Sequence, residues 1–282
     1  MEIEYLEAKR NLDDRSMNQR VWSRFEWAAC TRARESREGV RIVELGAGSG
    51  GMVERLESWG LLKAMDEEAT VRYEVVEPRQ DFLSNLEGRL KSKNLRGGYR
   101  VFHGTAREYL ESDARGSADI LLAHAVLDLV SAREASAVTA EILKPGGLLY
   151  ATITFDGESF FEPEIDRNLD EKVRRIYRES MVRDRGGETG FGRKLLVRLQ
   201  EAGFLIDEAG GSDWVVVPQD GEYRPGEELV VRTVLGMVST EMSGRIDQET
   251  GNRWSRERLA QLDRKELIFI AHQLDLLARR PG

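Results

Sequence analysis

An apolar, β-branched run near residue 45 ends in a glycine-rich turn. The turn contains Gly46, Ala47, Gly48 and Gly50, and an acid, Glu44, precedes it by two residues. Glycines let the backbone turn sharply with positive φ and let a ligand approach the backbone closely. A helical pattern begins directly after the turn, and the N-terminus of a helix presents free N–H groups that attract an anionic group. The spacing therefore predicts a strand–turn–helix unit that binds a ligand at its glycines.

Further polar residues follow the next apolar runs of the chain. Residues 71–77 predict a second strand, which ends in Glu77 and Pro78. A carboxylate at the carboxyl end of a parallel strand can accept hydrogen bonds from both hydroxyls of a ribose. A third strand over 100–103 leads into the turn Gly104-Thr105-Ala106.

The fourth predicted strand is apolar throughout and ends in His124. Such a run is typical of a central parallel strand that is buried on both faces, and open α/β sheets bind ligands at the carboxyl ends of these strands. His124 is therefore a candidate to line a pocket. It is also a candidate general base, since histidine titrates near neutrality, or a structural residue of the core.

The string Glu-x-Gly-x-Gly-x-Gly at residues 44–50 resembles the first motif of the class I S-adenosylmethionine (SAM)-dependent methyltransferases. With the later strand ends and a Pro-Gly-Gly turn, the resemblance covers residues 40–217. It implies that the glycine turn passes beneath the methionyl part of SAM, that Glu44 helps to position it, and that Glu77 binds the ribose. Thr105 stands where many members have an acid that meets the adenine. The implied cofactor-binding residues are Glu44, Gly46, Ala47, Gly48, Gly50, Glu77, Pro78, Gly104, Thr105, Ala106 and His124, with S-adenosylhomocysteine (SAH) as the product.

The elements that position these residues follow an α/β order. The expected fold is a doubly wound, mostly parallel sheet of seven strands with an antiparallel last strand. Residues 205–209 and 214–217, joined by a short turn, are expected to form the closing hairpin of strands six and seven.

Three further parts surround this sheet. Residues 1–38 predict an N-terminal helical segment packed on the core, residues 39–217 the SAM-binding domain, and residues 218–282 a C-terminal helical extension with helices over 227–242 and 256–279. Within the central domain, residues 164–194 predict a helical lid insertion. A glycine-rich loop follows the lid helix, and Arg183, Arg185 and Arg193 are candidates to bind a carboxylate or phosphate of the acceptor.

Composition restricts the remaining function classes. The chain has 282 residues, one Cys and a net charge of −8. One Cys excludes an internally disulfide-stapled scaffold, and the sequence has no apolar run long enough to cross a membrane. The charged start has no secretory pattern, so a cytoplasmic protein is expected. The three histidines have no metal-ligand spacing, so no metal is expected. Nucleic acid is not favoured as a partner, since binding phosphates needs a basic surface.

The expected function is methyl transfer from SAM to a small-molecule acceptor. An RNA-modifying methyltransferase that acts on tRNA is the alternative, and a non-catalytic SAM-binding module is a third hypothesis. The apolar faces of the C-terminal helices must pack on the sheet domain, on the lid or on a second chain. A homodimer is therefore among the expected partners.

Overall fold

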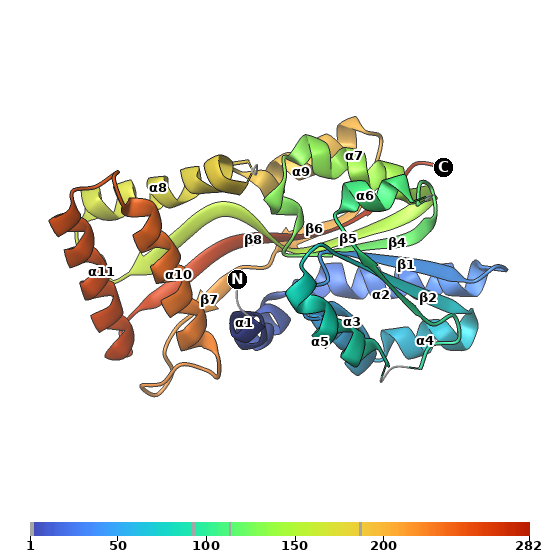
Figure 1. Cartoon of the computed structure of the whole chain (residues 1–282), viewed down its shortest axis with the longest axis horizontal. Coiled ribbons are helices and arrows are strands. Elements are labelled where there is room, and N and C mark those ends of the chain that lie inside the picture. Colours follow the sequence, from blue (N-terminus) through green and yellow to red (C-terminus); the bar gives the residue numbers. More distant parts are fainter. Residues whose placement is uncertain (1–2, 92–93, 113, 186–187) are drawn as a thin grey trace.

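The structure is a computed structural model that describes residues 3–91, 94–112, 114–185 and 188–282; the side chains of residues 181–185 lie outside this description. These residues form one eight-stranded sheet (Figure 1). Its strands are β1 (Val40–Leu45), β2 (Val71–Glu77), β3 (Tyr99–His103), β4 (Ala118–His124), β5 (Leu143–Glu162), β6 (Leu205–Gly211), β7 (Trp214–Val216) and β8 (Ile268–Arg279).

The strand order is β3-β2-β1-β4-β5-β8-β6, and β7 pairs with β8 beside this path. The pairs from β3 to β5 are parallel, whereas β8 runs antiparallel to β5, β6 and β7. The strand order reverses between β1 and β4, and ligands bind at such a switch point in open α/β sheets. The predicted α/β class, mostly parallel sheet and antiparallel last strand are confirmed. The predicted number of seven strands is wrong, because the described residues form eight: the segment expected to be a C-terminal helix supplies β8.

Helices cover both faces of the sheet (Figure 1). One face packs against α2 (Gln19–Glu35), α3 (Gly51–Ser58), α4 (Leu61–Glu68) and α5 (Gln80–Lys91). The other packs against α6 (Ala106–Glu111), α7 (Ala132–Ile142) and α9 (Phe191–Glu201), with the 3₁₀ turn η1 (Leu127–Leu129) after β4. The strand β4 is almost entirely apolar, as expected for a strand that is covered by helices on both faces.

The strands β5 and β8 continue beyond the parallel strands as a long antiparallel ribbon, and β7 pairs with the β8 part of this ribbon (Figure 1). Helices α8 (Arg167–Arg185), α10 (Glu227–Met242) and α11 (Gln248–Asp263) surround this ribbon. The helix expected within the insertion 164–194 corresponds to α8. Among the described residues, no helix has the length and apolar character needed to cross a membrane.

The prediction of a helix over residues 256–279 is wrong in its second half. Helix α11 ends at Asp263, and the residues from Ile268 onward form β8. The apolar side chains of β8 pack on both faces where it crosses the sheet, and such a dense run matches a helical period as well as a buried strand. The segment 218–282 is therefore not a purely helical extension, because its last strand lies inside the sheet.

The predicted hairpin of residues 205–209 with 214–217 is also wrong. Strands β6 and β7 do not pair with each other; each pairs with a different part of β8. The antiparallel last strand of the fold is β8, and α10 and α11 are inserted before it. A short turn between two strands favours a hairpin, but β8 supplies both with a longer partner.

Among the described residues, two helices form the predicted N-terminal helical segment before β1. The second of them is α2, which Asn18 caps: Oδ1 of Asn18 accepts hydrogen bonds from the amides of Arg20 and Val21. The first is α1 (Ile3–Ser16). It lies beside the carboxyl ends of the parallel strands and next to α10 (Figure 1).

Candidate active site

The glycine turn adopts the conformation that its sequence predicts. Gly46, Gly48 and Gly50 have φ values of 62°, 54° and 91°, which only glycine adopts at low cost. A Cβ on Gly46 would lie 2.4 Å from Cγ2 of Val126. The turn therefore needs glycine for both its backbone shape and the close approach of the loop after β4.

Glu77 at the end of β2 lies against this turn. Its Oε2 accepts a hydrogen bond from the amide of Gly48 at 2.7 Å, and its Oε1 accepts one from the amide of Arg79 at 2.9 Å. A carboxylate can accept about four hydrogen bonds, so these two contacts leave it capacity for two hydroxyl donors. Its buried position also fixes the direction in which it can bind them.

Glu44 lies deeper, on β1. It is 2 % exposed and accepts a hydrogen bond from the hydroxyl of Tyr73 at 2.6 Å. Burial raises the pKa of Glu44 to about 7, although the Tyr73 bond opposes this shift. The group can therefore change its charge near neutral pH, at the floor of the site.

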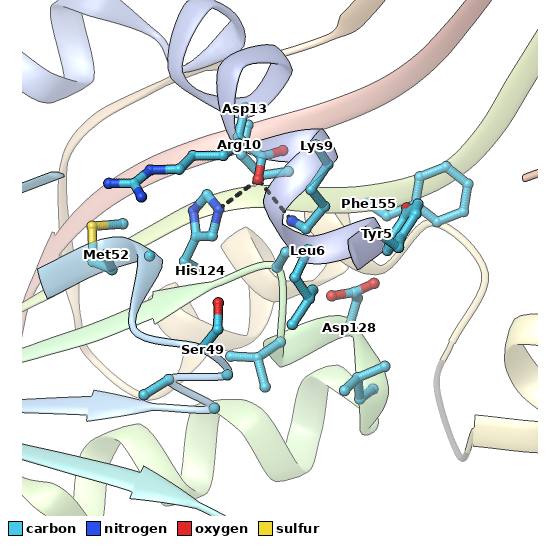
Figure 2. A pocket seen from close by; sticks show the side chains of 18 of the residues that line it. Tyr5, Leu6, Lys9, Arg10, Asp13, Ser49, Met52, His124, Asp128 and Phe155 are labelled. Carbon is cyan, nitrogen blue, oxygen red and sulfur yellow. Dashed lines mark hydrogen bonds and ion pairs between the residues drawn. The ribbon is translucent and has the colours of Figure 1, made fainter. Parts of the chain in front are cut away.

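His124 points into the site, as its place at the end of β4 predicts (Figure 2). Its Nδ1 lies 2.8 Å from Oγ1 of Thr152, and its Nε2 lies 3.0 Å from Oδ2 of Asp13 on α1. Nη1 of Arg55 is 3.1 Å from the same Nε2. Burial and the Arg55 guanidinium lower the pKa of His124 to about 3, so the imidazole is neutral at physiological pH.

Asp13 is the centre of this buried cluster. Its Oδ2 accepts a hydrogen bond from Lys9 at 2.7 Å (Figure 2). Its Oδ1 accepts one from Nε1 of Trp214 at 3.0 Å. Burial alone would raise the pKa of Asp13, but Lys9, His124 and Arg55 together hold it well below its usual range. The cluster joins α1, α3, β4 and β7 at one point.

Helix α1 covers the glycine turn. A Cβ on Gly48 would lie 3.5 Å from Cδ1 of Leu6, and Glu7 accepts hydrogen bonds from Ser49 at 3.0 Å and from Arg89 at 2.7 Å. Sequence reasoning missed this helix as part of the site. Its buried side chains include charged ones, Lys9 and Asp13, so they do not form the apolar stripe that marks a core helix.

These groups surround one cavity of about 400 Å³, a size within the range of small-molecule pockets. Of the predicted residues, those that line it are Glu44, Gly46, Ala47, Gly48, Glu77, Pro78 and His124. Beyond His124 the cavity continues between α1, α10 and the β5–β8 ribbon as a mainly apolar space, which we call the chamber. The residues that line the chamber include Phe155, Tyr177, Trp214, Val234, Phe269 and Gln273.

Other predicted residues do not line this cavity. Gly50 is the N-cap of α3, and Gly104 and Ala106 flank Thr105, which caps α6. The Thr105 hydroxyl accepts a hydrogen bond from the amide of Glu108, whose carboxylate accepts one from the amide of Thr105. Thr105 therefore forms a capping box, which accounts for it without a ligand.

Of the three predicted acceptor arginines, Arg193 has a described side chain, and it does not line the cavity. Arg193 donates hydrogen bonds to the buried Asp156 of β5 from its amide, at 3.0 Å, and from its guanidinium. Its side chain is 60 % exposed, outside the cavity. The side chains of Arg183 and Arg185 lie outside the described residues.

The comparisons with known proteins identify the fold. No protein-family model matches the chain, and no curated protein matches its sequence. A candidate methyltransferase from Bacillus halodurans is similar in structure with a TM-score of 0.51 and 14% identity, over 90% of this chain and 98% of that one. A candidate sarcosine dimethylglycine methyltransferase from Galdieria sulphuraria gives a TM-score of 0.50 and 16% identity, over 92% and 83%. The chain therefore has the Rossmann-like fold of these methyltransferases.

Proposed function

We propose that the protein is a SAM-dependent methyltransferase that acts on a small-molecule acceptor. One observation carries this proposal: a single cavity joins the glycine turn and Glu77 to an apolar chamber. The fold, shared with candidate methyltransferases, supports the same function.

The residues of the cavity fit the cofactor. The buried carboxylate of Glu77 has the capacity and position to bind two ribose hydroxyls. The positive φ values of the turn leave its backbone open to the methionyl part. SAM supplies a methyl group on a sulfonium, which transfers to a nucleophilic atom of the acceptor. The apolar walls of the chamber exclude water and hold the acceptor in line.

His124 has a positioning role in this proposal. An imidazole whose pKa is lowered to about 3 is a weak base, so it is poorly suited to remove a proton from the acceptor. Its contact with Asp13 instead holds α1 against the end of β4, and so positions the part of the cavity wall between the cofactor and the acceptor. Methylation of an acceptor atom that is already nucleophilic needs no strong base.

The RNA and non-catalytic hypotheses make different predictions. An RNA substrate requires a basic surface and salt-dependent binding, whereas the chain has a net charge of −8. A non-catalytic module would bind SAM without turnover of any acceptor. The homodimer also stays a prediction.

The test is calorimetric titration of the full chain with SAH, SAM and NAD, with bulk tRNA as a competitor. We expect both adenosyl compounds to bind and NAD not to bind. In Glu77→Gln, the affinity for SAH should fall by about tenfold to a hundredfold, because one or two hydrogen bonds to a charged acceptor are lost.

Asp81→Asn is the matched control. Asp81 lies on α5 close to Glu77 in sequence, but its side chain is 56 % exposed and pairs with Arg79. Its replacement should leave SAH affinity unchanged. Binding of NAD alone, or of no nucleotide, would refute the proposed cofactor. Unchanged SAH affinity in a folded Glu77→Gln variant would refute the role of Glu77.

A further inference from the structure

The floor of the cavity contains a buried carboxylate with one oxygen that a ligand can reach. Glu44 lines the cavity, is 2 % exposed and accepts the hydroxyl hydrogen of Tyr73 at its Oε2. Among the described residues, no group donates a hydrogen bond to its Oε1, and this oxygen is not one of the fully buried atoms that lack a partner. Oε1 therefore keeps some accessible surface, and because Glu44 is otherwise enclosed by the core, that surface opens into the cavity.

Neighbouring elements bring further ionisable groups to Glu44. From β2, the carboxylate of Glu77 disfavours the ionised form of Glu44, whereas the hydroxyl of Tyr73 favours it. From α3, the guanidinium of Arg55 also favours it, and the imidazole of His124 on β4 is neutral at physiological pH. Burial outweighs the favourable contacts and raises the pKa of Glu44 to about 7. In the free protein this carboxyl group therefore holds a proton about half of the time at neutral pH.

The cations that line the same cavity are each bound to carboxylates other than Glu44. Arg55 is shared between two acids of α1: its Nη2 lies 3.5 Å from Oδ2 of Asp13, and its Nε binds Asp14. The other pairs are Lys9 with Asp13, Arg10 with Glu54, Arg79 with Asp81, and Arg89 with Glu7 and Glu54. Within the described part of the chain, no cation forms an ion pair with Glu44, so a close counter-charge has to come from a ligand.

Two further carboxylates add to the negative charge of the cavity. Within the described residues, the hydrogen-bond donors to Glu77 are two backbone amides. Asp128, in η1 after β4, is buried and lines the same cavity (Figure 2). Acids that share an enclosed space of low dielectric disfavour one another's ionised form and favour a positively charged occupant.

SAM carries a positive charge that SAH lacks. The sulfur is a sulfonium in SAM and a neutral thioether in SAH, whereas the ammonium and carboxylate of the methionyl part are common to both. In the proposed function Glu77 binds the ribose and the glycine turn binds the methionyl part, and the sulfur joins these two parts covalently. The sulfur therefore lies along the part of the cavity between Glu77 and Gly46, where Glu44 directly precedes the turn.

We infer that Glu44 determines the preference of the site for SAM over SAH: its ionised carboxylate supplies the counter-charge of the sulfonium, and binding of SAM expels the proton that the free protein holds there. This inference rests on the proposed methyltransferase function. After methyl transfer the positive charge has left the sulfur, so the carboxylate takes up a proton from water. SAH is then bound without the charge interaction that SAM has.

The experiment is calorimetric titration of the full chain with SAM and with SAH, in phosphate and in imidazole buffer. Between about pH 6 and about pH 7.5, the ionised fraction of Glu44 rises from about a tenth to about three quarters. We expect the affinity for SAM to rise about fivefold to tenfold over this range and that for SAH to change less than about twofold. Because the two buffers differ in ionisation enthalpy, they also count protons: at about pH 7, SAM should release about half a proton from Glu44.

Glu44→Gln keeps the shape of the side chain and removes its charge. In this variant we expect the preference for SAM over SAH at about pH 7.5 to fall about fivefold or more, while SAH affinity stays unchanged. The amino group of each ligand titrates in both proteins, so the difference between wild type and variant reports Glu44 alone. Tyr73→Phe keeps the charge but removes its donor, so the rise of SAM affinity should move to higher pH.

Glu74→Gln is the matched control. Glu74 is likewise a buried glutamate of a strand and accepts a hydrogen bond from a tyrosine hydroxyl, that of Tyr109, at 2.8 Å. It does not line the cavity. Its replacement should leave the pH dependence of SAM binding as it is in the wild type.

Several outcomes would overturn the inference. They are an equal pH response of SAM and SAH in the wild type, a response to SAM that persists in folded Glu44→Gln, and SAM binding without proton release, which needs no variant. Failure of the proposed function gives a different result. In that case neither ligand binds at any pH and this inference falls with it, whereas binding of both without a pH-dependent preference refutes only the role of Glu44.

Discussion

Replacement of His124 by Asn should change how the stability of the protein depends on pH. His124 has a side chain that is 12 % exposed, and its pKa is lowered from 6.5 to about 3 by burial and by Arg55. Between these two values the unfolded chain binds a proton at this position and the folded chain does not. The free energy of unfolding is therefore not reduced by His124 above about pH 6.5, and it decreases as the pH falls from there toward 3.

The size of the effect follows from one proton. A difference of one bound proton changes the free energy of unfolding by about 1.4 kcal/mol for each pH unit. Between about pH 5.5 and about pH 4, the wild type should therefore lose about 2 kcal/mol more stability than His124→Asn. Asp13 adds to acid sensitivity mainly below this window, since its pKa is also depressed.

The assay is urea unfolding of both proteins at several pH values, with the free energy extrapolated to water. His103→Asn is the control, because His103 is an exposed residue at the end of β3. Its curve should be parallel to that of the wild type. If the curve of His124→Asn is parallel as well, the imidazole is not held neutral by the buried cluster and the reasoning is refuted.

Three further substitutions test the geometry of the site and its supports. Gly46→Ala should destabilise the fold by about 2 kcal/mol or more in urea unfolding, since a Cβ would clash and its φ is positive; Gly60→Ala, also at positive φ but with open space, should cost less. Thr105→Ala should cost about 1 kcal/mol by loss of the cap, and Thr105→Ser should restore it. Tyr73→Phe removes a hydrogen bond from Glu44, so its destabilisation should grow as the pH rises from about 6 to about 8 and the carboxylate ionises. A pH-independent loss would contradict that last expectation.

The sequence by itself determined the part of the site that depends on local geometry. The shape of a glycine turn between a strand and a helix depends on residues that are neighbours in sequence. The positions of Glu77 and His124 could be predicted because each stands at the end of a predicted parallel strand. Parallel strands bring their carboxyl ends to one edge of the sheet, so these residues meet without further information. Their position at one cavity was therefore predictable from the sequence.

Only the tertiary structure decided the rest. Lys9 and Asp13 are buried although they are charged, because they pair with each other and Asp13 also contacts His124 and Trp214 from other elements. A search for hydrophobic periodicity cannot detect a buried helix face of this kind. The pattern of residues 268–279 is compatible with a helix or with a buried strand. These residues form a strand because β5 offers an edge with which they pair in antiparallel orientation. Gln273 lines the chamber for the same reason. The chamber depends on pairings between residues far apart in the chain, and local spacing cannot encode them.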